Sequence, residues 1–242
     1  MEGLAVNLDR LKSNIDSVHS RIARALDQAG RPPGSVRLVA VTKRSPAEWV
    51  EPLARLGVVD LGENYPQELV RKFELTRALE PAPCWHLIGH LQSNKVKKVV
   101  GPLGQALVMI HSIDSLKLLD LVGEAALAAG VSPAVCLQVN TSAEPSKHGW
   151  TPESLLADAD RIAAPRAVPV VGLMTMAALG TTAETARGSF VRLRALRDQL
   201  AARTGRALPE LSMGMSSDYE TAVLEGATLV RVGSALFEGV EG

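Results

Sequence analysis

Eight short apolar segments, spaced along the whole chain, constrain its fold more than any other feature. They are rich in Val, Leu and Ile and do not alternate with polar residues, as is typical of strands covered on both faces in a parallel sheet. The predicted strands are Val36–Thr42, Val58–Gly62, Trp85–Gly89, Ala106–His111, Ala134–Asn140, Val168–Met174, Leu211–Met215 and Thr228–Val232. A sheet of this kind needs helices on both faces or around its outside.

Segments with helical spacing lie between these strands. SPAEWVEPLARLG predicts a helix that Pro52 shortens or kinks, and SIDSLKLLDLVGEAALAAG predicts one with Ile113 on its apolar face and a C-cap at Gly130. A longer amphipathic helix closes at Gly205. Another helix, Leu8–Ala29, precedes the first strand, with apolar residues at spacings of three and four.

The alternation of strands and helices predicts an α/β fold, a single (β/α)8 TIM barrel with an extra N-terminal helix. The alternative, an open doubly wound sheet, would want a glycine-rich turn after the first strand, and VTKRSP contains no glycine. We expect one domain over residues 1–242, with the N-terminal helix and lead-in over 1–35 and the barrel over 36–237.

Composition excludes several classes of partner. The 26 Lys and Arg residues equal the 26 Asp and Glu residues, so no net positive field favours nucleic acid or an anionic membrane. No signal peptide or membrane span is evident, which favours a cytoplasmic protein. Cys84 and Cys136 lie in apolar segments and are predicted to be buried free thiols. No group of His, Cys and Asp has metal-ligand spacing, so no metal is predicted.

Lys43 stands at the end of the first predicted strand. Side chains alternate along a strand, so Val39, Val41 and Lys43 point the same way. If the valines face the barrel interior, Lys43 projects into the open end, where barrels of this type carry their functional groups. The alternative is a solvated lysine at a strand tip.

The last two predicted strands end in SMGMSSD and RVGSALF. Loops at these positions of a barrel often hold a phosphate through backbone N–H groups. Alternatively, Ser216, Ser217 or Asp218 only caps the short helix predicted in SSDYETAVLEG. A lysine amine opposite a phosphate cradle suits a phosphorylated aldehyde, with which it forms a Schiff base. Pyridoxal 5′-phosphate (PLP) and sugar phosphates both fit, and the second leaves a sugar-phosphate aldolase or isomerase as an alternative.

Several strings, in order, then resemble one family. LVAVTK, LGENYPQE, WHLIGHLQSNK, QVNTSAEPSKHG, GLMTM and LSMGMSSDYETAVLEGATLVRVGSALF are similar to the YggS/PROSC family of pyridoxal phosphate homeostasis proteins. They cover roughly residues 36 to 237. That family is similar in turn to the barrel domain of fold-type III PLP enzymes such as alanine racemase, without their second domain.

The resemblance implies PLP as cofactor, held as a Schiff base on Lys43. It implies that Arg231 faces the pyridine nitrogen, which then stays unprotonated because a guanidinium keeps its protons, and the ring becomes a weaker electron sink. It assigns the phosphate to Ser216, Gly233 and Ser234, and the ring pocket to Asn64 and His86. For His86, a packed and hydrogen-bonded core histidine remains the alternative.

The chain departs from the family pattern in two places. AVTKRSP stands where AVSKTKP is common, so a second lysine is replaced by Arg44 or Ser45. GHLQSNK stands for GPLQSNK and adds His90, which is either a base at the rim or a solvated loop residue. Lys147 and His148 follow the fifth strand. They contact the cofactor or a partner that receives it, or they belong to a mobile loop.

The function predicted from the resemblance is to buffer or deliver PLP, without robust catalysis. The alternative is a PLP-dependent racemase, which needs a second base on the opposite face of the cofactor. The tyrosines that could serve are Tyr65 and Tyr219, and Pro66 suggests that Tyr65 packs locally in a turn. We expect a monomer whose partners are PLP and, transiently, enzymes that lack it.

Overall fold

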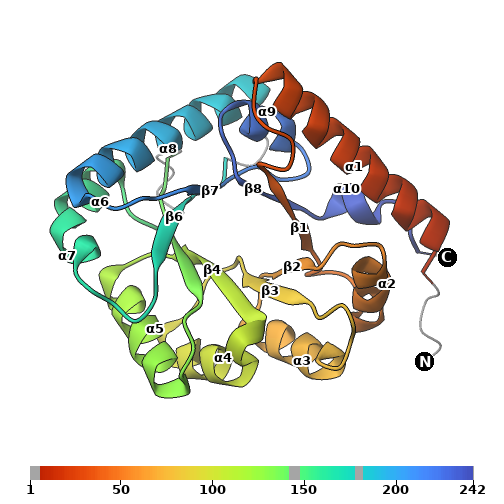
Figure 1. The fold of residues 1–242 in the computed structure, drawn as a ribbon, viewed down its shortest axis with the longest axis horizontal. Coiled ribbons are helices and arrows are strands. Elements are labelled where there is room, and N and C mark those ends of the chain that lie inside the picture. The colour runs from red at the N-terminus through yellow and green to blue at the C-terminus, as the bar shows by residue number, and fades with distance from the viewer. Residues whose placement is uncertain (1–5, 142–147, 178–181, 242) are drawn as a thin grey trace.

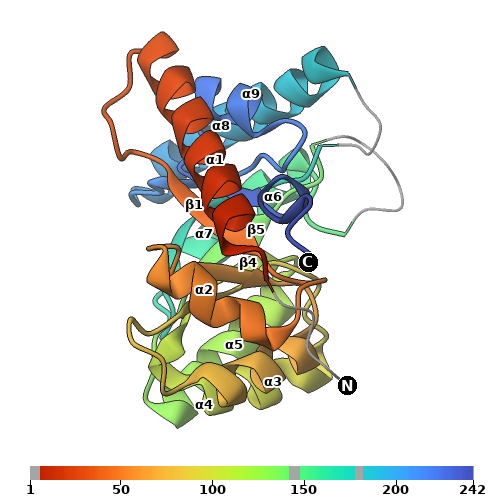
Figure 2. The same ribbon diagram turned by 90° about the vertical axis from the view of Figure 1, so that its right-hand side faces the viewer.

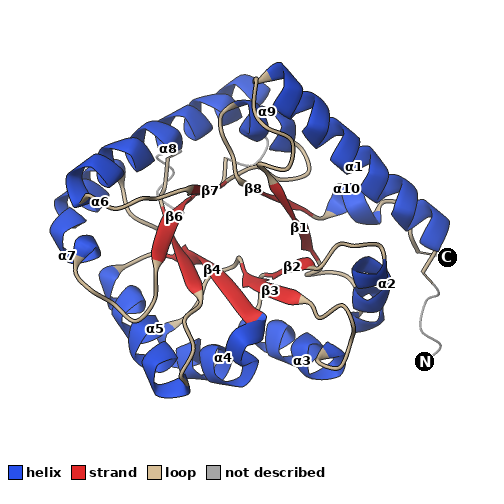
Figure 3. Cartoon of the chain, viewed as in Figure 1, coloured by secondary structure: helices blue, strands red, loops and turns tan. Residues whose placement is uncertain are grey.

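The computed structural model describes residues 6–141, 148–177 and 182–241, and in it the predicted strands form a closed parallel barrel. The strand order is β1 to β8 around the ring, with β8 pairing back to β1 (Figure 3). The strands are β1 Arg37–Val41, β2 Asp60–Glu63, β3 Cys84–Leu87, β4 Leu107–Ile113, β5 Ala134–Gln138, β6 Val170–Met174, β7 Glu210–Ser212 and β8 Leu229–Val232. The predicted (β/α)8 barrel is therefore confirmed.

Helices form the outer ring, and the two longest, α1 and α8, make two of its sides (Figure 1). The α-helices are α1 Leu8–Gln28, α2 Val50–Arg55, α3 Pro66–Thr76, α4 Val96–Leu103, α5 Leu116–Ala129, α6 Pro152–Ala157, α7 Ala159–Ala163, α8 Ala183–Thr204, α9 Tyr219–Leu224 and α10 Ser234–Phe237. Short 3-10 helices are η1 Ala47–Trp49, η2 Ser93–Lys95 and η3 Gly104–Ala106. None of the described helices combines the length and apolar character that crossing a membrane requires.

The N-terminal helix α1 begins where the sequence predicts. The Asn7 side chain accepts a hydrogen bond from the Arg10 amide, which satisfies one of the free N–H groups at the helix start. Its buried face, which includes Leu11, Ile15 and Ile22, packs against α9 and α10. Figure 2 shows α1 running along the outside of the barrel beside β1. The helix therefore covers the part of the wall where the first and last strands meet.

Three local predictions need correction. The segment around Pro52 is a 3-10 turn followed by α2, so the proline lies in the first turn, where it removes no helical hydrogen bond. Ile113 is the last residue of β4, and helix α5 begins only after the Ser115 N-cap, whose side chain accepts from the Leu118 amide. Both cysteines are free thiols, but only Cys136 is fully buried, while Cys84 is partly exposed.

The apolar core has two parts. A large cluster fills the space between the strands and the helices, and a smaller one lies inside the barrel. The interior cluster consists of Val39, Met109, Cys136, Met174 and Leu229. Because paired residues on neighbouring parallel strands face the same side, these residues identify which positions of each strand point inward.

Candidate functional site

A set of polar residues shares the barrel interior with the small apolar cluster. Arg231 pairs with Val39, Ser212 with Leu229, and His86 with Met109, so all three face inward. His111 lies two residues after Met109 on β4, and Asp60 lies two residues before Gly62, which pairs with His86. Side chains two residues apart on a strand point to the same side, so His111 and Asp60 also face inward. We call Asp60, His86, His111, Ser212 and Arg231 the interior chain.

Hydrogen bonds join the interior chain end to end. Arg231 Nη1 donates to Ser212 Oγ at 2.7 Å, and Ser212 Oγ lies 2.6 Å from His111 Nδ1. His111 Nε2 lies 2.9 Å from His86 Nδ1, and His86 Nε2 lies 2.8 Å from Asp60 Oδ1. A guanidinium only donates and a carboxylate only accepts, so each member between them accepts once and donates once. Both imidazoles are then neutral and carry their hydrogen on Nε2.

Burial keeps these histidines neutral. Burial places the pKa of His111 well below its usual value, and the unfavourable interaction of a protonated His111 with the His86 ring and the Arg231 cation lowers it further. Burial also lowers the pKa of His86, although its hydrogen bond with Asp60 opposes the shift. Burial lowers the pKa of Arg231 to about 10, so the guanidinium remains a cation at neutral pH. Its Nη2 donates to Thr175 O at 3.0 Å, so two uncharged oxygens hold this buried charge.

A second feature lies where β7 and β8 end. The backbone amides of Gly233 and Ala235 both donate to Ser216 Oγ, at 3.1 and 3.3 Å. We call these two amides and the Ser216 hydroxyl the cup. Ser234, the first residue of α10, is exposed beside it. Two N–H groups converging on one oxygen form an arrangement that suits an anion.

The turn before the cup needs a glycine. Gly214 has φ +95°, and a Cβ there would lie 2.6 Å from the Cβ of Ala222. This turn ends β7 at Ser212, earlier than predicted. Asp218 is the N-cap residue of α9, but its side chain accepts from the Met215 amide at 2.6 Å and makes no capping bond to the helix. Of the three predicted candidates, Asp218 therefore occupies the N-cap position without a side-chain capping bond, and Ser216 bonds the β8–α10 turn.

Lys43 lies on an exposed turn directly after β1. The residue before it, Thr42, faces outward toward α3, where its hydroxyl donates to Glu63 Oε1 at 2.7 Å. Lys72 of α3 donates to the same oxygen at 2.5 Å and to the Thr42 carbonyl at 2.6 Å. Lys72 and Glu63 are both fully buried. This buried ion pair holds the backbone that carries Lys43.

The cup and the end of β1 are neighbours. A Cβ on Gly233 would lie 3.2 Å from the carbonyl oxygen of Val41, and Lys43 follows Val41 by two residues. The predicted positions Lys43, Ser216, Gly233 and Ser234 therefore gather at one part of the barrel rim. Arg231 lies on the same strand as Gly233 but faces inward. We call this open end, formed by the carboxyl ends of the strands, the mouth.

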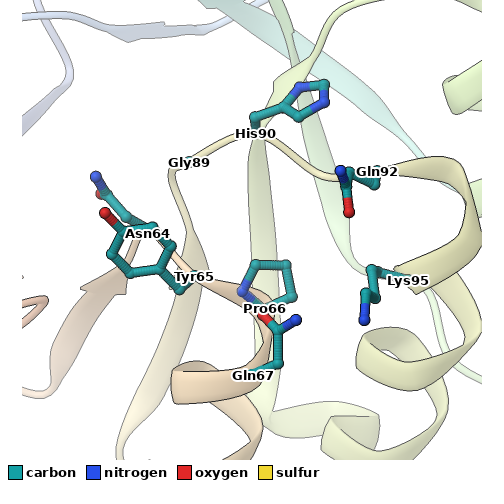
Figure 4. Close-up of a pocket in the computed structure, with 8 residues that line it drawn as sticks. All are labelled: Asn64, Tyr65, Pro66, Gln67, Gly89, His90, Gln92 and Lys95. Carbon is teal, nitrogen blue, oxygen red and sulfur yellow. The ribbon is translucent and has the colours of Figure 1, made fainter.

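Asn64 occupies a different part of the mouth. It lines a cavity of about 350 Å³ together with Tyr65, Pro66, Gln67, Gly89, His90, Gln92 and Lys95 (Figure 4). Tyr65 is 59% exposed, so the expectation that it packs locally is wrong. A Cβ on Gly89 would lie 2.2 Å from Asn64 O, which shows how closely the ends of β2 and β3 approach.

The structure places His86 away from this cavity. Its side chain is fully buried and both ring nitrogens have protein partners, which favours the packed core histidine over a contact in a ring pocket. Sequence reasoning named Arg231 as a site residue, but it missed Asp60, His111 and Ser212 of the interior chain, as well as Lys72. The signal available in the sequence was parity, because His111 lies two residues after Met109 on β4 and so points to the same side of the strand.

Comparison with known proteins decides the family. The family model for the alanine racemase N-terminal domain matches residues 6–240. A pyridoxal phosphate homeostasis protein of Pseudomonas aeruginosa is 40% identical over 95% of this chain and 96% of its own. That of Aquifex aeolicus is 38% identical over 92% of this chain and 95% of its own. This chain belongs to the pyridoxal phosphate homeostasis protein family.

Solved structures agree with this membership. PipY of Synechococcus elongatus PCC7942, a structure with PLP bound, superimposes with a TM-score of 0.82. It is 36% identical, and the match covers 94% of this chain and 99% of PipY. The fold is thus shared along nearly the whole length of both proteins.

Proposed function

We propose that this protein binds pyridoxal 5′-phosphate at the mouth of the barrel and serves to buffer or deliver it. The observation that carries the proposal is the cup beside β1, where two backbone amides meet one hydroxyl close to the strand that ends in Lys43. The names of the relatives and the PLP-bound PipY structure support it. The residues at this rim offer what the cofactor requires, namely an anion cradle, a primary amine and a buried cation.

Each group has a distinct task in the proposal. The amides of Gly233 and Ala235, with the Ser216 and Ser234 hydroxyls, bind the phosphate through hydrogen bonds, which are stronger when the acceptor is charged. Arg231 presents a donor that does not give up its proton toward the pyridine nitrogen. When bound, PLP supplies an aldehyde that condenses with a primary amine. Lys43 would supply that amine.

The position of Lys43 suits this task. Thr42 is turned outward to Glu63 and Lys72, so alternation directs the next side chain toward the interior side of the mouth. Lys43 is also exposed, which leaves its amine free to meet a cofactor arriving from solvent. The buried Lys72 is engaged with a carboxylate and a carbonyl and is therefore not a competing amine.

Storage or delivery accounts for the residues better than racemisation. A racemase needs a base on each face of the cofactor. Tyr219 is fully buried and lies under the Arg21 guanidinium of α1, 5.3 Å from ring centroid to Cζ, so it points away from the mouth. Tyr65 is exposed beside the Asn64 cavity. We propose further that the protein works as a cytoplasmic monomer and passes PLP to enzymes that lack it.

The test is to add PLP to the purified protein and to follow its visible absorption. We expect a yellow complex, and reduction with borohydride followed by peptide mass mapping should place the modification on Lys43. Lys43→Ala should lose the colour, whereas Lys117→Ala, an exposed lysine on α5, should keep it. Modification of another lysine in the wild type, or unchanged colour in Lys43→Ala, would contradict the proposal. Turnover of amino acids at an enzymatic rate would instead favour the racemase.

A further inference from the structure

Three metal-ligand side chains meet above the ends of three consecutive strands. His90 follows β3, Asp114 follows β4, and His148 precedes the segment that pairs with the end of β5. One ligand atom from each lies within 4.8 Å of the other two. His90 Nδ1 lies 3.2 Å from Asp114 Oδ2, and the two imidazole rings stack with their centroids 4.6 Å apart. We propose that these residues bind a divalent transition metal ion, with zinc the best fit.

The backbone of His90 is held in place on both sides of β3. Gly89, the residue before it, packs against the backbone of Asn64 so closely that a Cβ would lie 2.2 Å from Asn64 O. The Gly89 carbonyl accepts a hydrogen bond from Ser112 Oγ at 2.6 Å. Figure 4 shows the His90 imidazole turned away from Pro66 and Gln67, so it does not point into the cavity that they line. The ring is therefore free to face Asp114 and His148.

The backbone of His148 is anchored to β5. Its carbonyl accepts from Gln138 Nε2 at 2.9 Å, and the Trp150 amide donates to Gln138 O at 3.0 Å. Gly149 between them has φ +116°, and a Cβ there would lie 2.5 Å from Gln138 O. Only a glycine allows the chain to return this closely to the strand. His148 is thus presented at the mouth by a turn with a defined geometry.

The Asp114 carboxylate is also held in an orientation that suits metal binding. Its side chain is only 15% exposed, and its Oδ1 accepts from Ser115 Oγ at 3.2 Å. The other oxygen, Oδ2, faces His90. A hydrogen bond on the oxygen that does not bind the metal is the kind of outer contact that orients a carboxylate ligand. The three backbones are therefore fixed, and metal binding requires only rotation of two exposed imidazoles.

The donor set indicates which ion. Two imidazole nitrogens and one carboxylate oxygen suit zinc, which binds such atoms at about 2.0–2.2 Å in tetrahedral geometry. Two ligands of one tetrahedral zinc lie about 3.3 Å apart on that basis, close to the 3.2 Å between His90 and Asp114. Magnesium and calcium prefer oxygen ligands and are disfavoured here. Three protein ligands leave one coordination position open to water or a small anion.

The experiment is a calorimetric titration of zinc chloride into the full chain, purified without an affinity tag, with magnesium chloride as a parallel titrant. We expect one zinc per chain and no detectable heat with magnesium. His90→Ala and His148→Ala should each weaken zinc binding at least about tenfold, and Asp114→Asn should weaken it as well. Substituting cobalt for zinc should give the visible bands of a tetrahedral site.

His19→Ala is the matched control, because His19 is an exposed histidine on α1 away from the mouth. It should bind zinc as the wild type does. His90 and His148 are exposed, so their variants are expected to fold, and thermal melts by circular dichroism check this. Absence of stoichiometric zinc binding, or binding that survives both His90→Ala and His148→Ala, would overturn the proposal. The titration uses no PLP, so its outcome is independent of the proposed function.

Discussion

His111 Nε2 lies 2.9 Å from His86 Nδ1 in the interior of the barrel, and this contact joins the two halves of the interior chain. On one side Ser212 links His111 to the Arg231 cation, and on the other His86 reaches the Asp60 carboxylate. Every hydrogen bond runs in the same direction, from the cation to the anion. Such networks are favourable only when every member has its partner.

Removal of the middle member should therefore destabilise the barrel. His111→Leu leaves the Ser212 hydroxyl hydrogen and the His86 Nδ1 lone pair without a partner in the buried interior, at a cost of about 1–3 kcal/mol for each unsatisfied group. Urea unfolding measures the loss against His19→Ala, whose site is exposed. If His111→Leu unfolds at the same urea concentration as that control, the chain contributes nothing to stability.

The same histidines predict how stability depends on pH. Their pKa values are lowered in the folded protein, while in the unfolded chain they return to about 6.5. As the pH falls below that value, the unfolded state binds protons that the folded state cannot. The free energy of unfolding should then fall by at most about 1.4 kcal/mol per pH unit for each histidine, until the pH reaches the lower pKa of that histidine in the folded protein. Above that value these two groups add no pH dependence.

Urea unfolding at a series of pH values between about 7 and 5 gives this slope directly. His111→Asn should reduce the slope by one proton, because one of the two titrating groups is gone. A slope that is equal in the wild type and in His111→Asn would show that other groups cause the pH dependence.

The strands could be predicted from sequence because each is a short run of apolar residues, and the ends of α5 and α8 because a glycine stands at each of them. Gly130 and Gly205 both adopt the left-handed conformation that ends α5 and α8. Several predicted strands ran past their observed ends, and β7 differs most, since its predicted range continued through Gly214, where the backbone has a positive φ. That the chain forms one domain, and that it is a monomer, stay predictions.

The polar sites could not be predicted in the same way. The members of the interior chain come from β2, β3, β4, β7 and β8, and only the pairing register shows that they meet. His90, Asp114 and His148 are likewise brought together by three separate loops. Lys72 resembles a solvated helix residue until its partners are known, because one of them directly follows β1 and the other lies on β2. Contacts between segments that are far apart in the sequence leave no local sequence pattern from which they could be predicted.

Lys72 provides a third prediction. Lys72→Met leaves the buried Glu63 carboxylate without its cation, and loss of one partner of a buried pair typically costs about 3–5 kcal/mol. The double variant Lys72→Met with Glu63→Gln should recover much of the loss, because no uncompensated charge remains. Lys12→Ala, which removes an exposed i,i+4 pair with Asp16, should change the urea midpoint little. If Lys72→Met unfolds at the same urea concentration as Lys12→Ala, the stabilising role assigned to the Lys72–Glu63 pair is contradicted.

The fourth prediction concerns Gly214. Gly214→Ala places a methyl group 2.6 Å from the Cβ of Ala222 on a backbone with φ +95°, and strain of this kind costs on the order of 1–3 kcal/mol. Gly101→Ala in α4 is the matched control, because nothing lies within 4 Å of the added carbon, and alanine should stabilise that helix by roughly 0.5–1 kcal/mol. Thermal melts should therefore shift in opposite directions, and a shift in the same direction would contradict the strain.

The last prediction concerns the electrostatics of the proposed cofactor site. Arg231→Gln keeps a donor toward Ser212 but removes the positive charge from the interior of the barrel. PLP should still bind, since the cup and Lys43 are intact, but its visible absorption should shift because the charge facing the pyridine nitrogen is lost. Spectra of the two proteins at equal PLP occupancy make the comparison. An unchanged spectrum would place Arg231 away from that nitrogen, and loss of binding would mean that the guanidinium itself is needed to hold the cofactor.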